Sequence, residues 1–198
     1  KNWYLWAVLF YATNMKSFVN DLEGSFARSL AVCAVRCEPG VYSGSKWCGD
    51  RSAVLEAGAQ LSAYGVGVED LATKCALFVF FLVSGVWGPR PCLLIGFFAI
   101  GASCALFALA GSLPERGAEL YVAAQCVQGL NPAFYLQSLV TMYICCQPDG
   151  DWRINTELGM AMMLLSIRVR RFTHIFLEAL ELVDFRAVWW SISLLNMA

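Results

Sequence analysis

The sequence has a single histidine, His174, and few charged residues, which make up 15% of its 198 residues. One histidine without carboxylates arranged around it does not build a metal site, and neither H-E-x-x-H nor H-x-x-E-H occurs. The G-x-S-x-G nucleophile elbow of hydrolases is also missing. A net charge of −1 gives no electrostatic basis for binding nucleic acid. These absences argue against an enzyme and against a nucleic-acid-binding protein.

Charge is completely absent from two long stretches, residues 91–114 and residues 120–148. Hydrophobic residues make up 59% of the chain. A helix needs about 20 mostly apolar residues to cross the ~30 Å hydrocarbon core of a bilayer. Two uncharged stretches of at least that length in succession predict an all-α integral membrane protein that crosses the bilayer several times.

The most apolar part of the chain, residues 76–110, consists of two arms that meet at Pro89-Arg90-Pro91. Neither arm is expected to continue as one helix through the two prolines. The pattern therefore predicts two membrane helices joined by a short polar turn. The second membrane helix is expected over residues 61–87 and the third over residues 92–111.

The first and fourth membrane helices flank this hairpin. Apolar residues recur at helical spacing after Lys16, which favours one long first helix ending near Val35. These residues are Phe18, Leu22, Phe26, Leu30 and Cys33. The fourth helix is expected to begin near Leu120 and to kink at Asn131-Pro132, where freed backbone carbonyls need partners from neighbouring helices or water.

The last fifty residues have a different pattern. Acidic and apolar residues alternate from residue 175 to residue 184, which is typical of an amphipathic helix on a surface or a partner. The sequence thus predicts two parts: residues 1–148 with four transmembrane helices, and residues 149–198 with one or two irregular or interfacial helices. Lipid head groups or partner subunits are the expected contacts of a group of basic and aromatic side chains in the second part, and pairing with Glu178 or Glu181 is the alternative for the arginines. The group consists of Arg168, Arg170, Arg171, Trp189 and Trp190.

Two further features have alternative interpretations. His174 is either an interfacial histidine or an axial ligand to a pigment or haem. Cys37 and Cys48 bracket a polar loop rich in glycine and serine, and they form a disulfide if the loop faces an oxidising compartment or remain two free thiols if it does not.

Residues 85–96, GVWGPRPCLLIG, resemble the loop between helices two and three of the major facilitator superfamily. Gly88 and Arg90 match its second glycine and its final basic residue. The segment QCVQGL at residues 125–130 is similar to the Arg-x-x-x-Gly motif of the fourth helix. Over residues 2–142 the resemblance implies a major-facilitator-like half-bundle.

The sequence also departs from that family. Gly85 stands where the family has an acidic residue that gates alternating access, and Gln125 stands where it has arginine. A transporter of this kind has two halves with the site between them, and this chain supplies one half at most. We therefore expect a non-catalytic accessory subunit of a larger membrane complex, photosynthetic or respiratory, in a thylakoid or mitochondrial inner membrane. The bilayer, other membrane subunits and bound lipid or pigment are its expected partners.

The alternative is a solute transporter, or half of one. Its binding residues would be polar side chains within the predicted spans, because such residues normally face protein or water rather than lipid. They are Glu69, Asp70, Gln125, Gln128 and Asn131. Asp70 also lies four residues before Lys74, so an ion pair within one helix is the competing interpretation for this residue.

Overall fold

A computed structural model describes residues 3–34, 51–139, 141, 161 and 185–197. Their secondary structure is helical throughout, which confirms the all-α class. The helices are α1 (Trp3–Ala34), α2 (Arg51–Trp87), α3 (Pro89–Ser112), α4 (Gly117–Gln128) and α7 (Phe185–Met197), with a 3₁₀ turn at Pro114–Arg116 and a π-helical segment at Pro132–Leu136.

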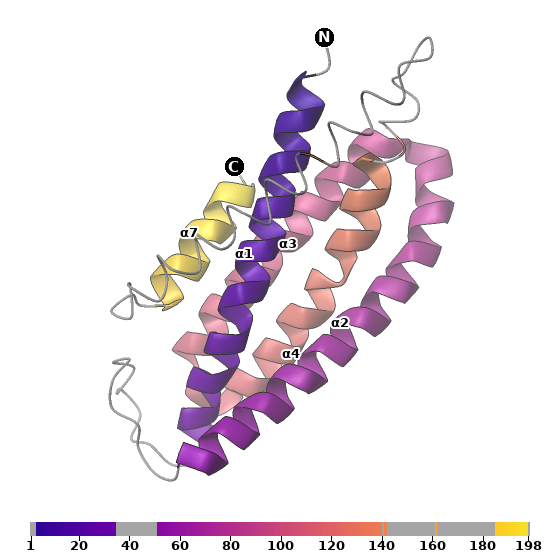
Figure 1. Cartoon of the computed structure of the whole chain (residues 1–198). Coiled ribbons are helices and arrows are strands. Elements are labelled where there is room, and N and C mark those ends of the chain that lie inside the picture. The colour runs from indigo at the N-terminus through magenta and orange to yellow at the C-terminus, as the bar shows by residue number, and fades with distance from the viewer. Residues whose placement is uncertain (1–2, 35–50, 140, 142–160, 162–184, 198) are drawn as a thin grey trace.

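The helices form an elongated bundle, shown in Figure 1. α1 and α2 lie side by side and run in opposite directions, and α4 packs between α2 and α3. The C-terminal helix α7 packs along α3. The first helix ends at Ala34, one residue from its predicted end, whereas α2 begins at Arg51 and is ten residues longer than the predicted span.

The turn between α2 and α3 lies at Gly88 and not at the two prolines. Gly88 has φ 78° and ψ 175°, a region that is essentially restricted to glycine. α3 already begins at Pro89, so both prolines lie in its first turn, where a missing N–H has no helical partner to lose. The predicted polar corner is thus wrong by a few residues, because proline starts helices as well as stopping them.

Gly88→Ala tests this turn. We expect the free energy of unfolding to fall by about 1 to 2 kcal/mol, because alanine is strained at this positive φ. The measurement is denaturant unfolding in mild detergent, followed by far-UV circular dichroism. Gly85→Ala is the control, since a Cβ there meets no atom within 4 Å and alanine favours helix. Equal stability of the two variants would contradict the strained turn.

The fourth helix is irregular close to the predicted kink at Asn131-Pro132. α4 ends at Gln128, and a π-helical segment begins at Pro132. The hydroxyl of Thr73 on α2 donates to the carbonyl oxygen of Gly129 over 3.0 Å. A backbone acceptor at the break is therefore satisfied by a neighbouring helix, as expected for irregular backbone inside a bundle.

Aromatic side chains hold the centre of the bundle together. The ring of Phe26 on α1 lies 5.9 Å from that of Phe107 on α3 and 5.7 Å from that of Trp189 on α7, both edge to face. Tyr121 on α4 joins the same cluster. Trp189 is fully buried within the chain, so it is not available as a contact for a partner. Trp190 is 41% exposed and remains available.

Small residues of α3 allow close helix contacts. A Cβ added to Gly96 would lie 2.6 Å from Cβ of Tyr135 and 2.8 Å from its backbone nitrogen. A Cβ on Gly101 would lie 2.8 Å from Met197 on α7. Tyr135 and α7 thus approach the backbone of α3 where a larger residue would not fit.

Within the described residues, one helix is long and apolar enough to cross a membrane, namely α3 (Pro89–Ser112). The sequence predicts four spans, and the other three stay predictions. Their helices differ from α3 in identifiable ways: α1 and α2 contain charged residues near their middles, and the fourth is interrupted after Gln128.

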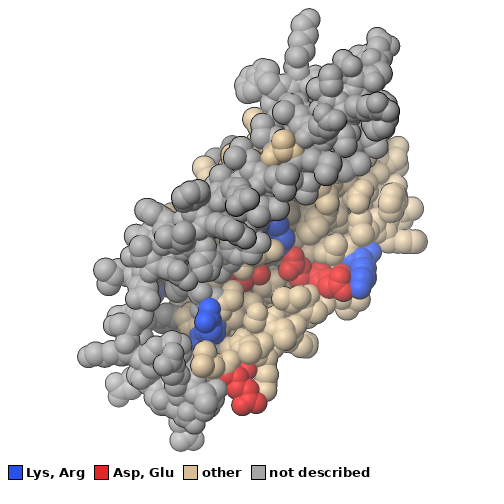
Figure 2. All heavy atoms as spheres, viewed as in Figure 1, with Lys and Arg blue, Asp and Glu red and all other residues tan. Residues whose placement is uncertain are grey.

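Large apolar side chains face outward over the C-terminal half of α2. Phe78, Phe81 and Val86 are 74%, 68% and 80% exposed. In Figure 2 the charged side chains form a few separate groups, and the upper right of the described surface, where α2 ends, carries none. A contiguous apolar surface of this kind is typical of contact with lipid or protein.

Candidate functional site

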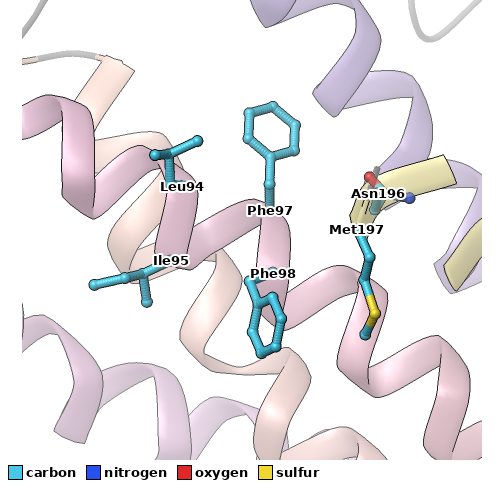
Figure 3. A pocket seen from close by; sticks show the side chains of 6 residues that line it. All are labelled: Leu94, Ile95, Phe97, Phe98, Asn196 and Met197. Atoms are coloured by element: carbon cyan, nitrogen blue, oxygen red, sulfur yellow. The ribbon is translucent and has the colours of Figure 1, made fainter. Parts of the chain in front are cut away.

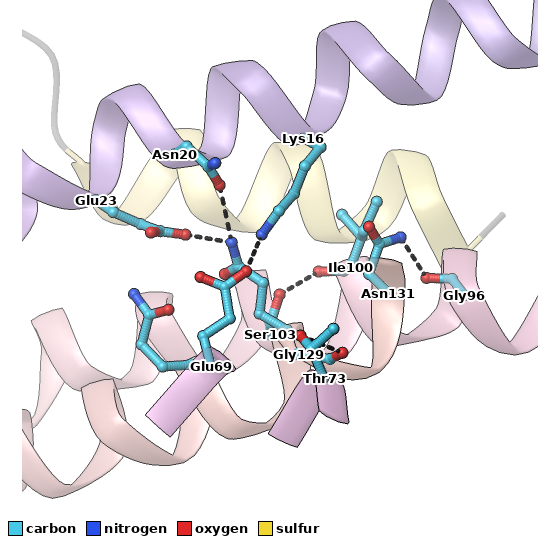
Figure 4. Close-up of polar contacts among 12 residues, drawn as sticks. Lys16, Asn20, Glu23, Glu69, Thr73, Gly96, Ile100, Ser103, Gly129 and Asn131 are labelled. Atoms are coloured by element: carbon cyan, nitrogen blue, oxygen red, sulfur yellow. Dashed lines mark hydrogen bonds and ion pairs between the residues drawn. The ribbon is translucent and has the colours of Figure 1, made fainter. Parts of the chain in front are cut away.

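Polar and charged residues converge in the interior of the bundle, between α1, α2 and α4 (Figure 4). From α1 come Lys16, Asn20 and Glu23, whose spacing of four and three residues places them on one helix face. The same spacing on α4 places Tyr121, Gln125 and Gln128 together, and α2 adds Glu69. We call these seven residues the polar cluster.

An ion pair joins α1 to α2 in this cluster. Lys16 Nζ lies 2.5 Å from Glu69 Oε1, and the two side chains are only 20% and 16% exposed. Water therefore screens the pair less than it screens a surface pair. Figure 4 shows the two side chains reaching toward each other across the gap between their helices.

A second carboxylate, Glu23, is bound by amides rather than by a cation. Gln128 Nε2 donates to Glu23 Oε1 and also to Asn20 Oδ1, the latter over 3.3 Å. Gln128 is fully buried and Glu23 is 6% exposed. Gln125 is a further hydrogen-bonding neighbour of this carboxylate. A buried carboxylate is costly unless it is hydrogen-bonded or paired, and these contacts provide the hydrogen bonds.

Two buried amide oxygens of the cluster lack a donor. Gln125 Nε2 donates to the hydroxyl oxygen of Tyr121 over 3.1 Å, but Gln125 Oε1 has no hydrogen-bond partner among the described residues. Gln128 Oε1 has none either. Buried polar atoms without partners are rare in folded proteins, so two in one cluster mark a place where a ligand or water is needed.

The structure separates the five residues that the sequence proposes for a transport site. Glu69, Gln125 and Gln128 lie in the polar cluster. Asp70 points outward and pairs with Lys74, 2.5 Å away and more than 60% exposed, which confirms the ion pair within the helix. Asn131 donates to the carbonyl oxygen of Gly96 over 3.0 Å and so links the broken helix to α3.

Sequence reasoning missed the residues that α1 contributes. Lys16, Asn20 and Glu23 form a polar stripe with helical spacing that the sequence shows. The sequence alone does not reveal that this stripe faces Glu69 and Gln128, since that depends on how α1 packs against α2 and α4.

The other candidate residues lie elsewhere or outside the described residues. Gly88 forms the turn between α2 and α3, and Arg90 is exposed at the start of α3. The remaining candidates fall on residues that the structure does not describe. They are Cys37, Cys48, Arg168, Arg170, Arg171 and His174.

A groove of about 430 Å³ lies between α3 and α7 (Figure 3). Leu94, Ile95, Phe97 and Phe98 line it on one side, and Asn196 and Met197 lie on the other. Its lining is almost entirely apolar. The groove offers contact area for a hydrocarbon chain or a side chain, but no group for chemistry.

The polar cluster suits binding better than covalent chemistry. It contains carboxylates, amides, a hydroxyl and an ammonium group, with no cysteine or histidine among its seven residues. Among the described residues no three histidine, cysteine, aspartate or glutamate side chains come together as a metal site. Comparison with protein-family models, curated proteins and solved structures gives no match to this chain.

Proposed function

We propose that this chain is a solute transporter, with the polar cluster as its binding site. In this proposal α1, α2 and the broken fourth helix cross the bilayer together with α3. The observation that carries it is a group of buried polar side chains in a bundle that exposes large apolar ones. The fully buried side chains include Gln125 and Gln128, whereas Phe78 and Val86 are more than 70% exposed.

A soluble protein places charged residues outside and large apolar residues inside. In a transporter within lipid, apolar residues face the hydrocarbon, and ionisable residues at membrane depth face the bundle interior or a water-filled path. Lys16, Glu23 and Glu69 fit the second pattern, since they lie between α1, α2 and α4. The departure at Gly85 means that gating here does not use the acidic residue that the family has in this loop.

Solute uptake tests this function. The full chain is expressed in cells, and uptake of a radiolabelled panel of amines, amino acids, sugars and carboxylates is compared with that of cells without it. We expect at least one solute to accumulate, and Gln128→Leu to lower its rate at least about tenfold by removing the hydrogen bond to Glu23. Gln60→Leu, on the exposed surface of α2, is the matched control.

A second candidate function is that of a non-catalytic accessory subunit of a larger membrane complex. The apolar surface of α2 supports it, because Phe81, Leu82 and Trp87 are each at least 60% exposed and offer a broad contact for a partner. The discriminating measurement is particle mass after extraction in mild detergent. Co-purification with a large assembly, together with no uptake of any solute, would favour the accessory role.

A further inference from the structure

Counted by formal charges, the polar cluster has one carboxylate more than it has cations. Its ionisable side chains, apart from the tyrosine, are the two carboxylates Glu23 and Glu69 and the single ammonium group of Lys16. Lys16 is paired with Glu69, which leaves Glu23 with hydrogen bonds from neutral amides and no ion pair among the described residues. The other described ion pair, Asp70 with Lys74, lies on the outer surface and does not change this balance.

The cluster also has too few hydrogen-bond donors. Both N–H groups of Gln128 are used, one on Glu23 and one on Asn20, while its oxygen has no partner. Rotating this amide by 180° would place its oxygen against two other oxygens, so the contacts themselves fix its orientation. Gln125 donates from its nitrogen to Tyr121 and is a hydrogen-bonding neighbour of Glu23, while its oxygen has no partner among the described residues.

We propose that the polar cluster binds a small protonated amine. An –NH₃⁺ group offers one positive charge and three N–H donors. The charge matches the excess carboxylate Glu23, and the donors match Gln125 Oε1, Gln128 Oε1 and the remaining acceptor capacity of Glu23. This inference rests on the proposed function and specifies its substrate class.

Binding of labelled methylammonium tests the proposal without measuring transport. The full chain is purified in mild detergent, and binding is followed by equilibrium dialysis at constant ionic strength. We expect saturable binding that ammonium displaces. Tetramethylammonium has the same charge but no N–H donor, and we expect it to compete at least about tenfold more weakly. Sodium is expected not to compete at equal concentration.

Two variants assign the binding to the cluster. Glu23→Gln keeps the size of the side chain and removes its charge, and we expect the affinity for methylammonium to fall at least about tenfold. Glu56→Gln makes the same change on the exposed surface of α2 and should leave the affinity unchanged. Gln128→Met is the second cluster variant and should also weaken binding, and circular dichroism confirms that each variant is folded.

Several results would overturn the inference: no saturable binding, displacement by sodium as effective as by ammonium, or normal binding by folded Glu23→Gln and Gln128→Met. The outcome is separable from that of the proposed function. Methylammonium binding without uptake of any solute leaves the amine site in place and removes the transport proposal. Uptake of a sugar or carboxylate without methylammonium binding removes the amine site alone.

Discussion

Gly96→Val is expected to lower the free energy of unfolding by about 3 kcal/mol, at the upper end of what overpacking costs. The backbone of Tyr135 leaves no space for a side chain, since a Cβ on Gly96 would lie 2.8 Å from its nitrogen and 2.9 Å from its Cα. Backbone atoms do not rotate away as the end of a flexible side chain does. The π-helical segment would have to move off α3, and the hydrogen bond from Asn131 to Gly96 would be strained with it.

The matched control is Gly67→Val. Gly67 lies in the middle of α2, and a Cβ there meets no atom within 4 Å. We expect its stability to stay within about 0.5 kcal/mol of the unmodified chain, because glycine and valine differ little in helix propensity. Both variants are measured by denaturant unfolding in mild detergent. If Gly96→Val is as stable as Gly67→Val, the contact between α3 and the π-helical segment is looser than described.

Lys16→Met and Lys74→Met should lower the free energy of unfolding by different amounts, although the two ion pairs have the same length. Each lysine lies 2.5 Å from its carboxylate, but the first pair is 20% and 16% exposed and the second 68% and 62%. Lys16→Met leaves Glu69 and Glu23 in the bundle without a cation. We expect it to lower the free energy of unfolding by about 2 to 3 kcal/mol. Lys74→Met removes an exposed pair, and we expect it to lower the free energy of unfolding by at most about 0.5 kcal/mol.

A double variant separates the ion pair from the packing of Lys16. Lys16→Met combined with Glu69→Met removes both charges, and it should recover part of the stability lost in Lys16→Met alone. Denaturant unfolding of the two single variants, the pair and Lys74→Met measures these differences. Equal losses for Lys16→Met and Lys74→Met would show that the pair inside the bundle is screened as strongly as the pair on the outer face of α2.

The sequence alone determined the class and much of the helix pattern. The uncharged stretch at residues 91–114 predicts the most apolar helix, which the structure places at Pro89–Ser112. Spacing by four residues predicts the long first helix, and Asn131-Pro132 predicts the break in the fourth. The i, i+4 spacing of Asp70 and Lys74 predicts their ion pair. These features depend on residues close in sequence, so local rules are sufficient.

Tertiary packing alone decided what the polar residues do. Glu69 and Asp70 are neighbours in sequence, yet one faces Lys16 inside the bundle and the other faces outward, because adjacent helical residues point about 100° apart. Gln128 meets Glu23 although 105 residues separate them, and Trp189 is buried against Phe26 on the first helix. Such contacts depend on how α1, α4 and α7 pack, and the spacing of residues within one helix does not contain that information.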